Sequence, residues 1–499
     1  MNAQSDPRRS PAMWAALVLA AVLLLALQAR LSGLGERSLW LDEAFGAVNA
    51  ARPPAEIVLR PVCCHPPVGG LILRVWMALF GTGEVALRLP AVICGLLAVA
   101  GIFWLGRRWF GLAGGLAAAA LGALSSSMVF YSREVNPYGL AMLLGVGLLW
   151  LAQAAWARPS RASLAGFGAA AAVALLTYYG FVILLAAINA GLLAGWIAHV
   201  RAEPERRREL AGRLGRVVAC QLPALALFGA YYLRYTSGQV GAASAGAPTF
   251  SPGPLDFGRQ TFGFVQFLSV GMQPHAVLTW AWGALLAVGL AGCLRRRATL
   301  WLAVALLAAL GLSYGLASRG LFFYADRHIL FAAPLALLII GAGVQMLAGW
   351  LGRAPLGRPL LAVALAAALA MQIPRLPQGD LAGLRTGIPA EQLGPVLECV
   401  ARSRQPGDGM FVFYGAEWPF RYYNSRLGWP ATIGRWARND LSAQLSEAAG
   451  ALGGGRGWLV VSHDYWGEGG PLLAGLSRDR TVAQSCEDIG AWAVLLTPP

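Results

Sequence analysis

The stretch Leu39-Trp40-Leu41-Asp42-Glu43 places two adjacent carboxylates soon after the first apolar run of the chain, which extends from Trp14 to Leu27. On membrane-insertion scales an acidic residue at the centre of a spanning helix costs about 2.5–3.5 kcal/mol, so acids beside the apolar phase are usually functional. We therefore take Asp42 and Glu43 as candidates for a reaction centre. The alternative is that they only stabilise the start of a helix at the membrane surface.

The composition indicates an integral membrane protein. Of 499 residues, 57% are hydrophobic and only 13% are charged, whereas about 25% of the residues of a soluble domain are charged. The net charge is +15, and all 39 basic residues are Arg. They lie between apolar runs and form no continuous basic face, which is typical of membrane loops and not of nucleic-acid-binding proteins.

The apolar runs predict about eleven membrane-spanning helices. The first begins at Trp14, and Leu27-Gln28-Ala29 is a poor signal-peptidase site, so an uncleaved anchor is expected. Residues 66–80 are apolar and amphipathic but short, which favours a helix lying in the membrane interface. The other ten spans are expected at residues 85–105, 112–130, 137–156, 163–177, 181–199, 217–233, 276–293, 299–317, 329–350 and 359–374.

The arginines predict the orientation of these spans. With the N-terminus in the cytoplasm, every turn expected on the cytoplasmic side carries at least two Arg, as the positive-inside rule requires. These turns contain Arg107 and Arg108; Arg158 and Arg161; Arg201, Arg206, Arg207, Arg208, Arg213 and Arg216; Arg295, Arg296 and Arg297; Arg353 and Arg358. An odd number of spans then leaves the C-terminal region on the extracytoplasmic side of the plasma (inner) membrane.

The character of the chain changes after residue 376. Half of the 24 acidic residues lie in 377–499, so we expect a transmembrane domain at 1–376 and a solvated domain at 377–499. Strand-like runs at 410–414, 458–462 and 492–496 alternate with helical patterns at 389–403 and 439–452, which predicts an α/β domain. Asn439 is the expected N-cap of the second helix. The glycines at 453–455 precede a strand and do not open a helix, so they do not form a phosphate loop.

The cysteines leave one pairing open. Cys399 and Cys486 are the only two cysteines in the solvated domain. They could form a disulfide if that domain faces an oxidising compartment, but the sequence does not show that they do. No spacing of the seven cysteines is typical of a zinc site.

The membrane part has few charges, and many of them fall in loops expected on the extracytoplasmic side. Carboxylates can accept a proton from a hydroxyl, and Arg can hold a phosphate in a planar fork. Together they suit a substrate with a phosphate head and an apolar tail. Residues 237–254, rich in Gly, Ala, Ser and Pro, are expected to form a mobile loop or lid. Tyr131 and Tyr138 are expected to be aromatic residues of the membrane interface.

Five short motifs occur in register with this topology. They are Leu39-Trp40-Leu41-Asp42-Glu43, His65-Pro66-Pro67, Ala86-Leu87-Arg88-Leu89-Pro90, Tyr131-Ser132-Arg133-Glu134 and Arg327-His328-Ile329-Leu330. In order and spacing the chain resembles, over roughly residues 10–375, the GT-C fold glycosyltransferases that use a polyprenyl-phosphate sugar. That group includes protein mannosyltransferases, lipid A aminoarabinose transferases and lipopolysaccharide galacturonosyltransferases. The resemblance implies an α-helical polytopic membrane protein with a C-terminal extracytoplasmic α/β domain.

The resemblance also implies roles for individual residues. Asp42 resembles the family's catalytic base, with Glu43 beside it, and Glu134 resembles the second carboxylate. His65 and Arg327 resemble residues that contact the donor phosphate, and their neighbours His328 and Arg133 are further substrate-binding candidates. Three alternatives stay open: Glu134 pairs with Arg133 as a structural salt bridge, His65 is an ordinary loop histidine, and Arg327 anchors a lipid headgroup.

Metal use stays open in the sequence. Some relatives bind a metal through acids near the Pro-Pro motif, but here the neighbouring residues are Cys63 and Cys64. No cofactor is required by the sequence, and a divalent metal is not favoured.

The expected function is transfer of a sugar from a polyprenyl-phosphate donor to a hydroxyl of an envelope glycan, lipid or protein. A transporter or flippase of a lipid-linked sugar is the alternative, and it would favour acids and helix breaks within the spans, together with internal repeats. A scaffold that recruits envelope partners is a third possibility. The sugar, the acceptor and the oligomeric state are left open.

Overall fold

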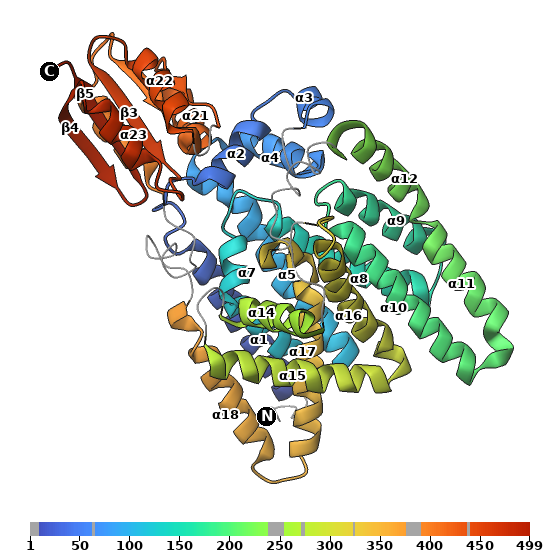
Figure 1. The fold of residues 1–499 in the computed structure, drawn as a ribbon. Coiled ribbons are helices and arrows are strands. Elements are labelled where there is room, and N and C mark those ends of the chain that lie inside the picture. Colours follow the sequence, from blue (N-terminus) through green and yellow to red (C-terminus); the bar gives the residue numbers. More distant parts are fainter. Residues whose placement is uncertain are drawn as a thin grey trace, which may run out of the picture. The chain divides into compact units, whose positions relative to one another are not determined.

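The structure, a computed structural model, describes residues 9–61, 65–237, 254–270, 275–322, 325–375, 391–436 and 440–499. The chain forms two compact units, and Figure 1 labels their elements. The first unit contains Met1–Ser32, Pro53–Ile72 and Arg88–Pro377, and the second contains Gly33–Arg52, Leu73–Leu87 and Gln378–Pro499. The sequence predicted two domains with a boundary at residue 376. In the structure, residues 33–52 and 73–87 belong to the same unit as the C-terminal region. The predicted domain boundary therefore stays a prediction.

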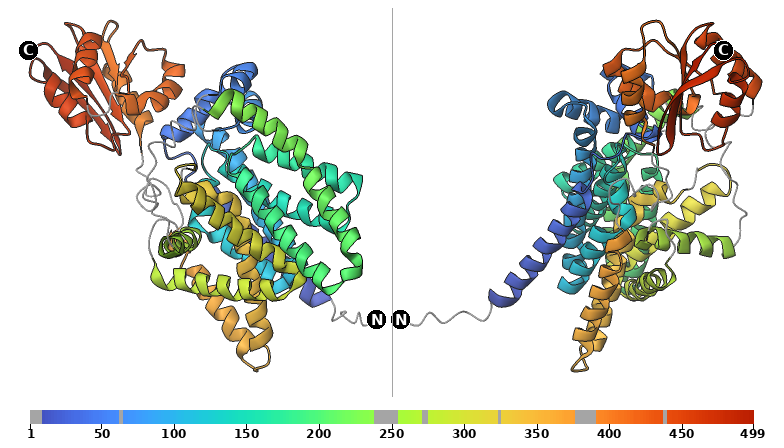
Figure 2. Two further views of the ribbon diagram at one scale, coloured as in Figure 1. Left: turned by 45° about the vertical axis from the view of Figure 1, so that its right-hand side comes forward. Right: turned by 90° about the vertical axis from the view of Figure 1, so that its left-hand side faces the viewer.

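The first unit is built from helices. They are α1 (Arg9–Leu31), α3 (Pro54–Leu59), α6 (Leu112–Leu124), α7 (Ser126–Tyr131), α8 (Tyr138–Ala157), α9 (Arg161–Leu175), α10 (Phe181–Ala202), η1 (Pro204–Arg206), α11 (Arg207–Ala219), α12 (Leu222–Tyr231), η2 (Tyr232–Thr236), α14 (Pro254–Val270), α15 (Ala276–Arg295), α16 (Arg297–Ala317), η3 (Asp326–Ala332), α17 (Ala333–Leu351), α18 (Gly357–Ala370) and η4 (Ile373–Arg375). Helices α4 (Pro67–Phe80) and α5 (Glu84–Phe110) have residues in both units. Figure 2 shows α8, α10 and α16 as long helices that run side by side.

Eight helical stretches among the described residues are long and apolar enough to cross a membrane. They are Met13–Leu31, Glu84–Phe110, Tyr138–Ala157, Phe181–Ala202, Pro204–Thr236, Ala276–Arg295, Arg297–Ala317 and Asp326–Leu351. The expected polytopic helical membrane fold is confirmed. The three remaining expected spans coincide with shorter apolar helices, of which α6, α9 and α18 are the main parts. The count of eleven therefore stays a prediction, as does the interfacial position of α4.

Glycines allow two of these helices to approach closely. A Cβ atom at Gly289 of α15 would lie 1.9 Å from the carbonyl oxygen of Ile339 in α17, and one at Gly343 would lie 2.1 Å from that of Leu285. Only a hydrogen fits at either position. Small residues at helix crossings are typical of membrane proteins, where close packing replaces the hydrophobic effect as the force that holds helices together.

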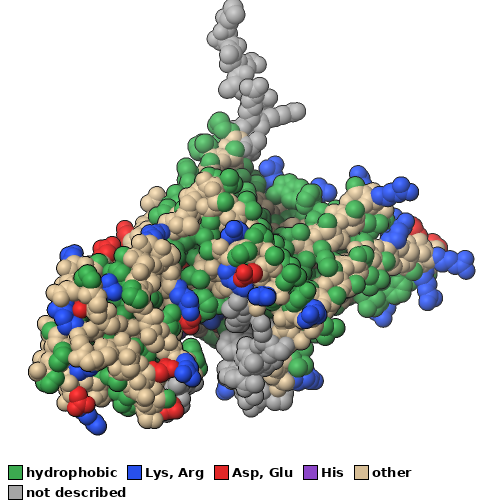
Figure 3. Space-filling model, turned by 90° about the horizontal axis from the view of Figure 1, so that it is seen from above, with side chains coloured by type: hydrophobic (Ala, Val, Ile, Leu, Met, Phe, Trp, Pro, Cys, Tyr) green, Lys and Arg blue, Asp and Glu red, His purple; other side chains and the backbone are tan. Residues whose placement is uncertain are grey.

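The surface agrees with a membrane environment. Large apolar side chains such as Leu24, Trp280 and Val363 are each 66% exposed, and Figure 3 shows hydrophobic side chains over much of one face. Basic side chains gather in the same view at the far right end, where α10 and α11 are joined. Exposed arginines of this connection include Arg201 and Arg207.

The second unit contains a five-stranded sheet with the order β2-β1-β3-β5-β4. Strand β1 pairs in parallel with β2 and β3, whereas β5 pairs antiparallel with β3 and β4. Helices cover both faces of the sheet: α20 and α21 contribute to the apolar layer around Val412 and Trp458, and α22 and α23 to the layer around Phe411 and Leu459. The elements are α2 (Leu41–Ala50), α20 (Leu393–Ser403), β1 (Gly409–Val412), η5 (Tyr414–Ala416), α21 (Glu417–Leu427), β2 (Thr432–Ile433), α22 (Leu441–Leu452), β3 (Gly457–Ser462), α23 (Gly469–Leu476), β4 (Thr481–Asp488) and β5 (Ala491–Thr497).

The expected α/β architecture of the C-terminal region is confirmed, with two additions and one correction. The three expected strands correspond to β1, β3 and β5, while β2 and β4 were not expected. Strand β2 has only two residues, and seven of the eight residues of β4 are at least partly exposed, so neither has an apolar run. The N-cap of α22 is Asp440, whose side chain accepts a hydrogen bond from the amide of Ala443. Asn439 itself lies outside the described residues, as do Cys63, Cys64 and residues 238–253.

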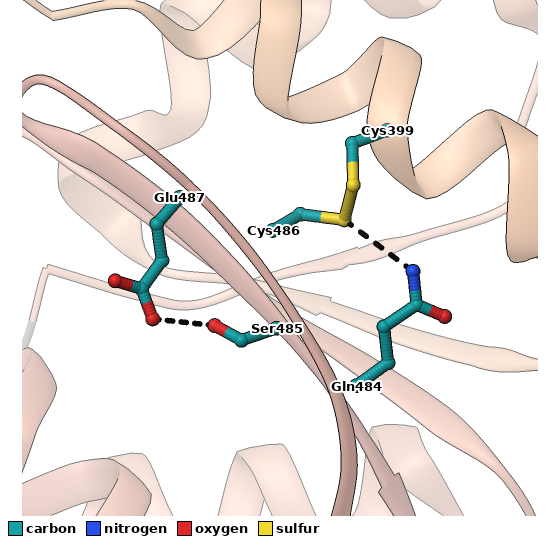
Figure 4. The surroundings of a disulfide bond; sticks show 5 residues. All are labelled: Cys399, Gln484, Ser485, Cys486 and Glu487. Atoms are coloured by element: carbon teal, nitrogen blue, oxygen red, sulfur yellow. Dashed lines mark hydrogen bonds between the residues drawn. A yellow bond between two sulfur atoms is a disulfide. The ribbon is translucent and has the colours of Figure 1, made fainter.

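Cys399 of α20 and Cys486 of β4 form a disulfide (Figure 4). Their Cα atoms are 5.9 Å apart and the two residues are separated by 87 positions. Cys486 is buried in the apolar layer under α20. A bond that closes so long a loop restricts the unfolded chain strongly.

Loss of this disulfide should destabilise the C-terminal unit by about 2–4 kcal/mol. We expect faster amide hydrogen exchange throughout residues 391–499 of the full-length Cys399→Ser/Cys486→Ser variant, and the same change in wild type after reduction. The reductant should have no further effect on the variant. Equal exchange in the oxidised wild type and in the variant would contradict a stabilising role.

Candidate functional site

Four of the expected site residues converge in the first unit. His65 precedes α4, Glu134 follows α7, and Arg327 and His328 open the 3₁₀ helix η3. These segments are far apart in the chain, yet tyrosines and charges connect all four residues. The structure therefore brings together residues that the sequence related only by resemblance.

A row of aromatic rings forms the centre of this cluster. The rings of His65 and Tyr178 lie 6.0 Å apart, those of Tyr178 and Tyr138 6.1 Å, and those of Tyr138 and Tyr131 5.1 Å. The hydroxyl of Tyr178 donates a hydrogen bond to the carbonyl oxygen of His328 at 3.2 Å. Tyr131 and Tyr138 are each only 4% exposed. The expectation that these two are aromatic residues of the membrane interface is therefore wrong, because they are packed inside the protein.

The charges of Glu134 and Arg327 act on the same tyrosine. The pKa of Tyr131 is raised by burial and by the negative charge of Glu134, and Arg327 opposes this through its positive charge and a hydrogen bond. Glu134 has no exposed surface. A buried carboxylate and a guanidinium around one phenol thus place opposite charges close together, and the guanidinium lowers the cost of burying the carboxylate.

His65 lies beside Arg327 but is held neutral. Burial, and to a smaller extent the positive charge of Arg327, lowers the pKa of His65 to about 4. Its Nδ1 atom is buried and makes no hydrogen bond to any residue that the structure describes. The Nε2 atom of His328 lies 3.5 Å from the Nε atom of Arg327. Arg327 is thus the cation of this group at neutral pH. His65 has a neutral ring, and its Nδ1 atom makes no hydrogen bond among the described residues.

Arg133 points toward the end of the first helix. Its guanidinium donates a hydrogen bond to the carbonyl oxygen of Ser32, directly after α1, and the side chain is only 7% exposed. This contact gives Arg133 a structural role at the end of α1. Its expected role in substrate binding stays a prediction.

Asp42 and Glu43 lie in the second unit, in the first turn of α2. The helix N-cap is Trp40, which makes no side-chain capping bond, so neither acid is itself the cap. Glu43 has no exposed surface, and its Oε2 atom lies 3.5 Å from the Nη2 atom of Arg37. Asp42 is half-buried. The two neighbours therefore differ: Glu43 is committed to a buried ion pair, and Asp42 is the one that solvent or a substrate can reach.

The segment before α2 is held by residues that come more than 350 positions later. The Oε1 atom of Gln392 accepts a hydrogen bond from the amide of Ser38 at 2.8 Å, and the hydroxyl of Tyr423 accepts one from the amide of Leu39 at 3.0 Å. Tyr423 in turn donates to Glu84 at 2.9 Å. The C-terminal region thus fixes the backbone from which Asp42 projects. No local pattern in the sequence could have shown this, because the contacts join distant parts of the chain.

The pairing of Asp42 with Glu134 stays a prediction, since the two residues belong to different units. Among the described residues, no group of three or more His, Cys, Asp or Glu side chains is placed to hold a metal ion. Cys63 and Cys64, which stand where some relatives have acids, lie outside the described part of the chain.

Comparisons with known proteins agree with this architecture. Residues 64–204 match the family model described as dolichyl-phosphate-mannose-protein mannosyltransferase. The crystal structure of ArnT from Cupriavidus metallidurans in the apo state matches with a TM-score of 0.59 and 16% identity, over 97% of this chain and 98% of that chain. The same protein bound to undecaprenyl phosphate matches with a TM-score of 0.56 at 16% identity, over the same shares of both chains.

A third structure is more distant. The Archaeoglobus fulgidus oligosaccharyltransferase, tethered with an acceptor peptide, matches with a TM-score of 0.53 and 14% identity, over 96% of this chain and 74% of that chain. Comparison with curated protein sequences gives no match. At these identities the likeness concerns the fold, and the expected GT-C fold is confirmed.

His65 should stay neutral throughout the physiological pH range. We expect histidine NMR of ¹⁵N-labelled protein, with the His65 signal identified by its loss in His65→Gln, to give a pKa well below 6.5. Arg327→Gln should raise this pKa only in part, because burial is the larger cause. Since the unfolded chain takes up the proton more readily, the His65 contribution to stability should be lost as the pH falls from about 6.5 toward 4. A pKa of 6.5 or above in wild type would contradict the buried position.

Tyr423→Phe should loosen the segment that carries Asp42. The change removes the acceptor for the amide of Leu39, a loss of about 1 kcal/mol, so amide hydrogen exchange at residues 38–43 should become about fivefold to tenfold faster. Tyr422→Phe is the matched control, because the Tyr422 hydroxyl donates to the carbonyl oxygen of Thr82 instead. Unchanged exchange at residues 38–43 in Tyr423→Phe would show that this bond does not hold the segment.

Proposed function

We propose that this chain, which has the GT-C fold of membrane glycosyltransferases, transfers a sugar from a polyprenyl-phosphate donor to a hydroxyl acceptor on the extracytoplasmic face of the inner membrane. The observation that carries the proposal is the group of buried Tyr131 and Glu134 with half-buried His65 and Arg327 in the first unit. The chemistry of its arginine and unprotonated histidine suits a phosphate. The match to the mannosyltransferase model and the undecaprenyl phosphate bound by ArnT support a lipid phosphate as the ligand.

The orientation is supported by two independent features. Disulfides such as Cys399–Cys486 persist in oxidising compartments outside the cytoplasm. Arginines concentrate in the connections expected to be cytoplasmic, as at Arg207 and Arg208 between α10 and α12. Both features favour an extracytoplasmic C-terminal region.

In the proposed reaction Asp42 accepts the proton of the acceptor hydroxyl. The hydroxyl oxygen attacks the anomeric carbon, and the bond between that carbon and the phosphate oxygen breaks, so polyprenyl phosphate leaves with the electron pair. A single displacement of this kind inverts the anomeric configuration. Asp42 suits the role of base better than Glu43, because Glu43 is buried against Arg37.

Arg327 and His65 stabilise the leaving phosphate. Arg327 carries the positive charge, and each preorganised group of this kind typically lowers the barrier by about 3–4 kcal/mol. His65 contributes a neutral N–H, because its pKa of about 4 leaves it unprotonated. An approaching phosphate would favour the protonated ring, so binding of the lipid phosphate should be accompanied by proton uptake near His65. Glu134 is the proposed second carboxylate, and His328 and Arg133 complete the proposed substrate-binding set.

Asp42→Asn should slow transfer strongly and leave donor binding intact. A positioned general base contributes about 10²- to 10⁴-fold, so kcat should fall within that range while the Kd for the donor changes little. The measurement is transfer by purified full-length protein from a panel of labelled polyprenyl-phosphate sugars to envelope extracts. Glu36→Gln is the matched control, an exposed acid of the same unit that should leave kcat unchanged.

Two results would contradict the proposal. One is that the wild type transfers or releases no sugar from any donor of the panel. The other is that Asp42→Asn transfers sugar as fast as the wild type. Movement of the intact donor across the bilayer of proteoliposomes, without transfer, would favour the transporter alternative. Full activity of Glu134→Gln would remove only the second carboxylate from the mechanism.

A further inference from the structure

The C-terminal α/β region contains a second group of aromatic residues, none of which has a part in the proposed reaction. Tyr414 follows β1, Trp436 follows β2, and Trp466 follows β3. Because these three strands are neighbours and run parallel, their carboxyl ends meet at one edge of the sheet. The three rings therefore gather at this edge although they are spread over more than 50 residues of sequence.

The edge is the place where open α/β sheets usually bind ligands. The chain leaves β1 toward α21, which packs on one face of the sheet, and leaves β3 toward α23, which packs on the other. Two adjacent parallel strands whose connections go to opposite faces leave a crevice outside their carboxyl ends. Tyr414 and Trp466 follow these two strands.

The rings form a continuous surface with an exposed top. The ring centroids of Tyr414 and Trp436 are 4.7 Å apart, and those of Trp436 and Trp466 are 5.8 Å apart at a nearly perpendicular angle of 81°. Trp436 is 63% exposed and Trp466 is 41% exposed, whereas Tyr414 is buried beneath them. Exposed neighbouring tryptophans are costly for a soluble surface and usually mark an interaction site.

Polar groups of fixed position border the rings. The Tyr414 hydroxyl donates a hydrogen bond to Glu468, and the Nε2 atom of Gln444 lies 3.4 Å from the same carboxylate. The loop that carries Trp466 and Glu468 is held by Asp464, which accepts hydrogen bonds from the amides of Glu468 at 2.8 Å and Gly469 at 2.9 Å. Rings and carboxylate are thus set in place before any ligand arrives, which lowers the entropic cost of binding.

The backbone between β3 and Trp466 is strained. His463 has a φ of 54° and is the sole non-glycine residue with positive φ among those described. Its Nδ1 atom lies 2.5 Å from the Oε1 atom of buried Glu391, which holds the ring in place. A Cβ atom at Gly415 would lie 2.8 Å from the carbonyl oxygen of His463, so only glycine lets the two loops approach this closely. Strain of this kind persists where a site needs it.

We propose that the aromatic surface formed by Trp436 and Trp466 at this edge binds a neutral hexopyranose segment of a glycan. The apolar C–H face of a pyranose ring fits against an exposed indole, and its hydroxyls can donate to Glu468 and exchange hydrogen bonds with Gln444. A phosphate or another anion is disfavoured by the Glu468 and Asp464 carboxylates. A purely apolar ligand would cover the half-buried Glu468 and Asp464 carboxylates without making hydrogen bonds to them, which costs free energy. That this glycan is the acceptor of the transfer reaction rests on the proposed function, but the binding itself does not.

The test is direct binding of full-length protein in detergent to fluorescently labelled cellohexaose, chitohexaose and mannohexaose, without any lipid donor. At least one of them should bind to wild type. Trp436→Ala and Trp466→Ala should each raise its Kd by about tenfold, the loss expected for one stacking ring. Trp436→Phe should recover part of this loss, which a merely structural role would not predict.

Val482→Ala is the matched control, because Val482 is an exposed apolar residue of the same region on strand β4, at the other edge of the sheet. Its Kd for the oligosaccharide should equal that of wild type. The amide hydrogen exchange of all variants should also match that of wild type, which shows that they are folded. The proposal is overturned if none of the three oligosaccharides binds to wild type, or if the Trp436→Ala/Trp466→Ala variant binds as tightly. Failure of sugar transfer with intact oligosaccharide binding would instead overturn the proposed function alone.

Discussion

The burial of carboxylates in each of the two units is the constraint on which this structure depends. Glu43 and Glu134 both have no exposed surface. An ionised carboxylate in such a place is stable only with a cation and hydrogen-bond donors around it, and removing one partner typically costs about 3–5 kcal/mol. Arg37 lies beside Glu43. Arg327 and Glu134 both interact electrostatically with Tyr131. Each of these two buried acids therefore has an arginine in its surroundings, in a chain of which only 13% of the residues are charged.

This constraint separates residues that look equivalent in sequence. Asp42 and Glu43 are adjacent acids, but the helical turn directs Glu43 to Arg37 and leaves Asp42 partly exposed. His65 and Arg327 both look basic, but burial keeps His65 neutral and leaves Arg327 as the cation. Glu43 is thus part of a buried ion pair and His65 is neutral, whereas Asp42 is half-buried and Arg327 is a cation. The proposed mechanism uses the pairs in this way.

The C-terminal α/β region has a structural part in the same arrangement. Gln392 and Tyr423 bind the backbone just before Asp42, and Trp418 packs edge-to-face on Phe45 with ring centroids 4.9 Å apart. A region that the sequence predicts only as a solvated α/β domain thus also holds the segment of the proposed base. Its removal would free that segment as well as remove the proposed glycan site.

Local sequence patterns were sufficient to predict where the helices lie in the chain. They were not sufficient to predict the contacts between the helices. Apolar runs predicted α5, α8, α10 and α16 because a span must hide its backbone in a continuous apolar helix. Strands β2 and β4 were missed because one is very short and the other is largely exposed. His65, Glu134, Arg327 and His328 were expected from resemblance, but the buried tyrosines between them were not, since burial depends on packing across distant helices.

The most direct test of the central claim is a cryo-EM structure of the protein with undecaprenyl phosphate. The account predicts phosphate density in contact with the Arg327 guanidinium and within hydrogen-bonding distance of the His65 ring, with the lipid chain along the apolar surface of the first unit. Arg327→Gln should weaken binding of this lipid by about tenfold or more, since a charge-assisted contact is lost. Phosphate bound elsewhere, or equal binding by Arg327→Gln, would contradict the account.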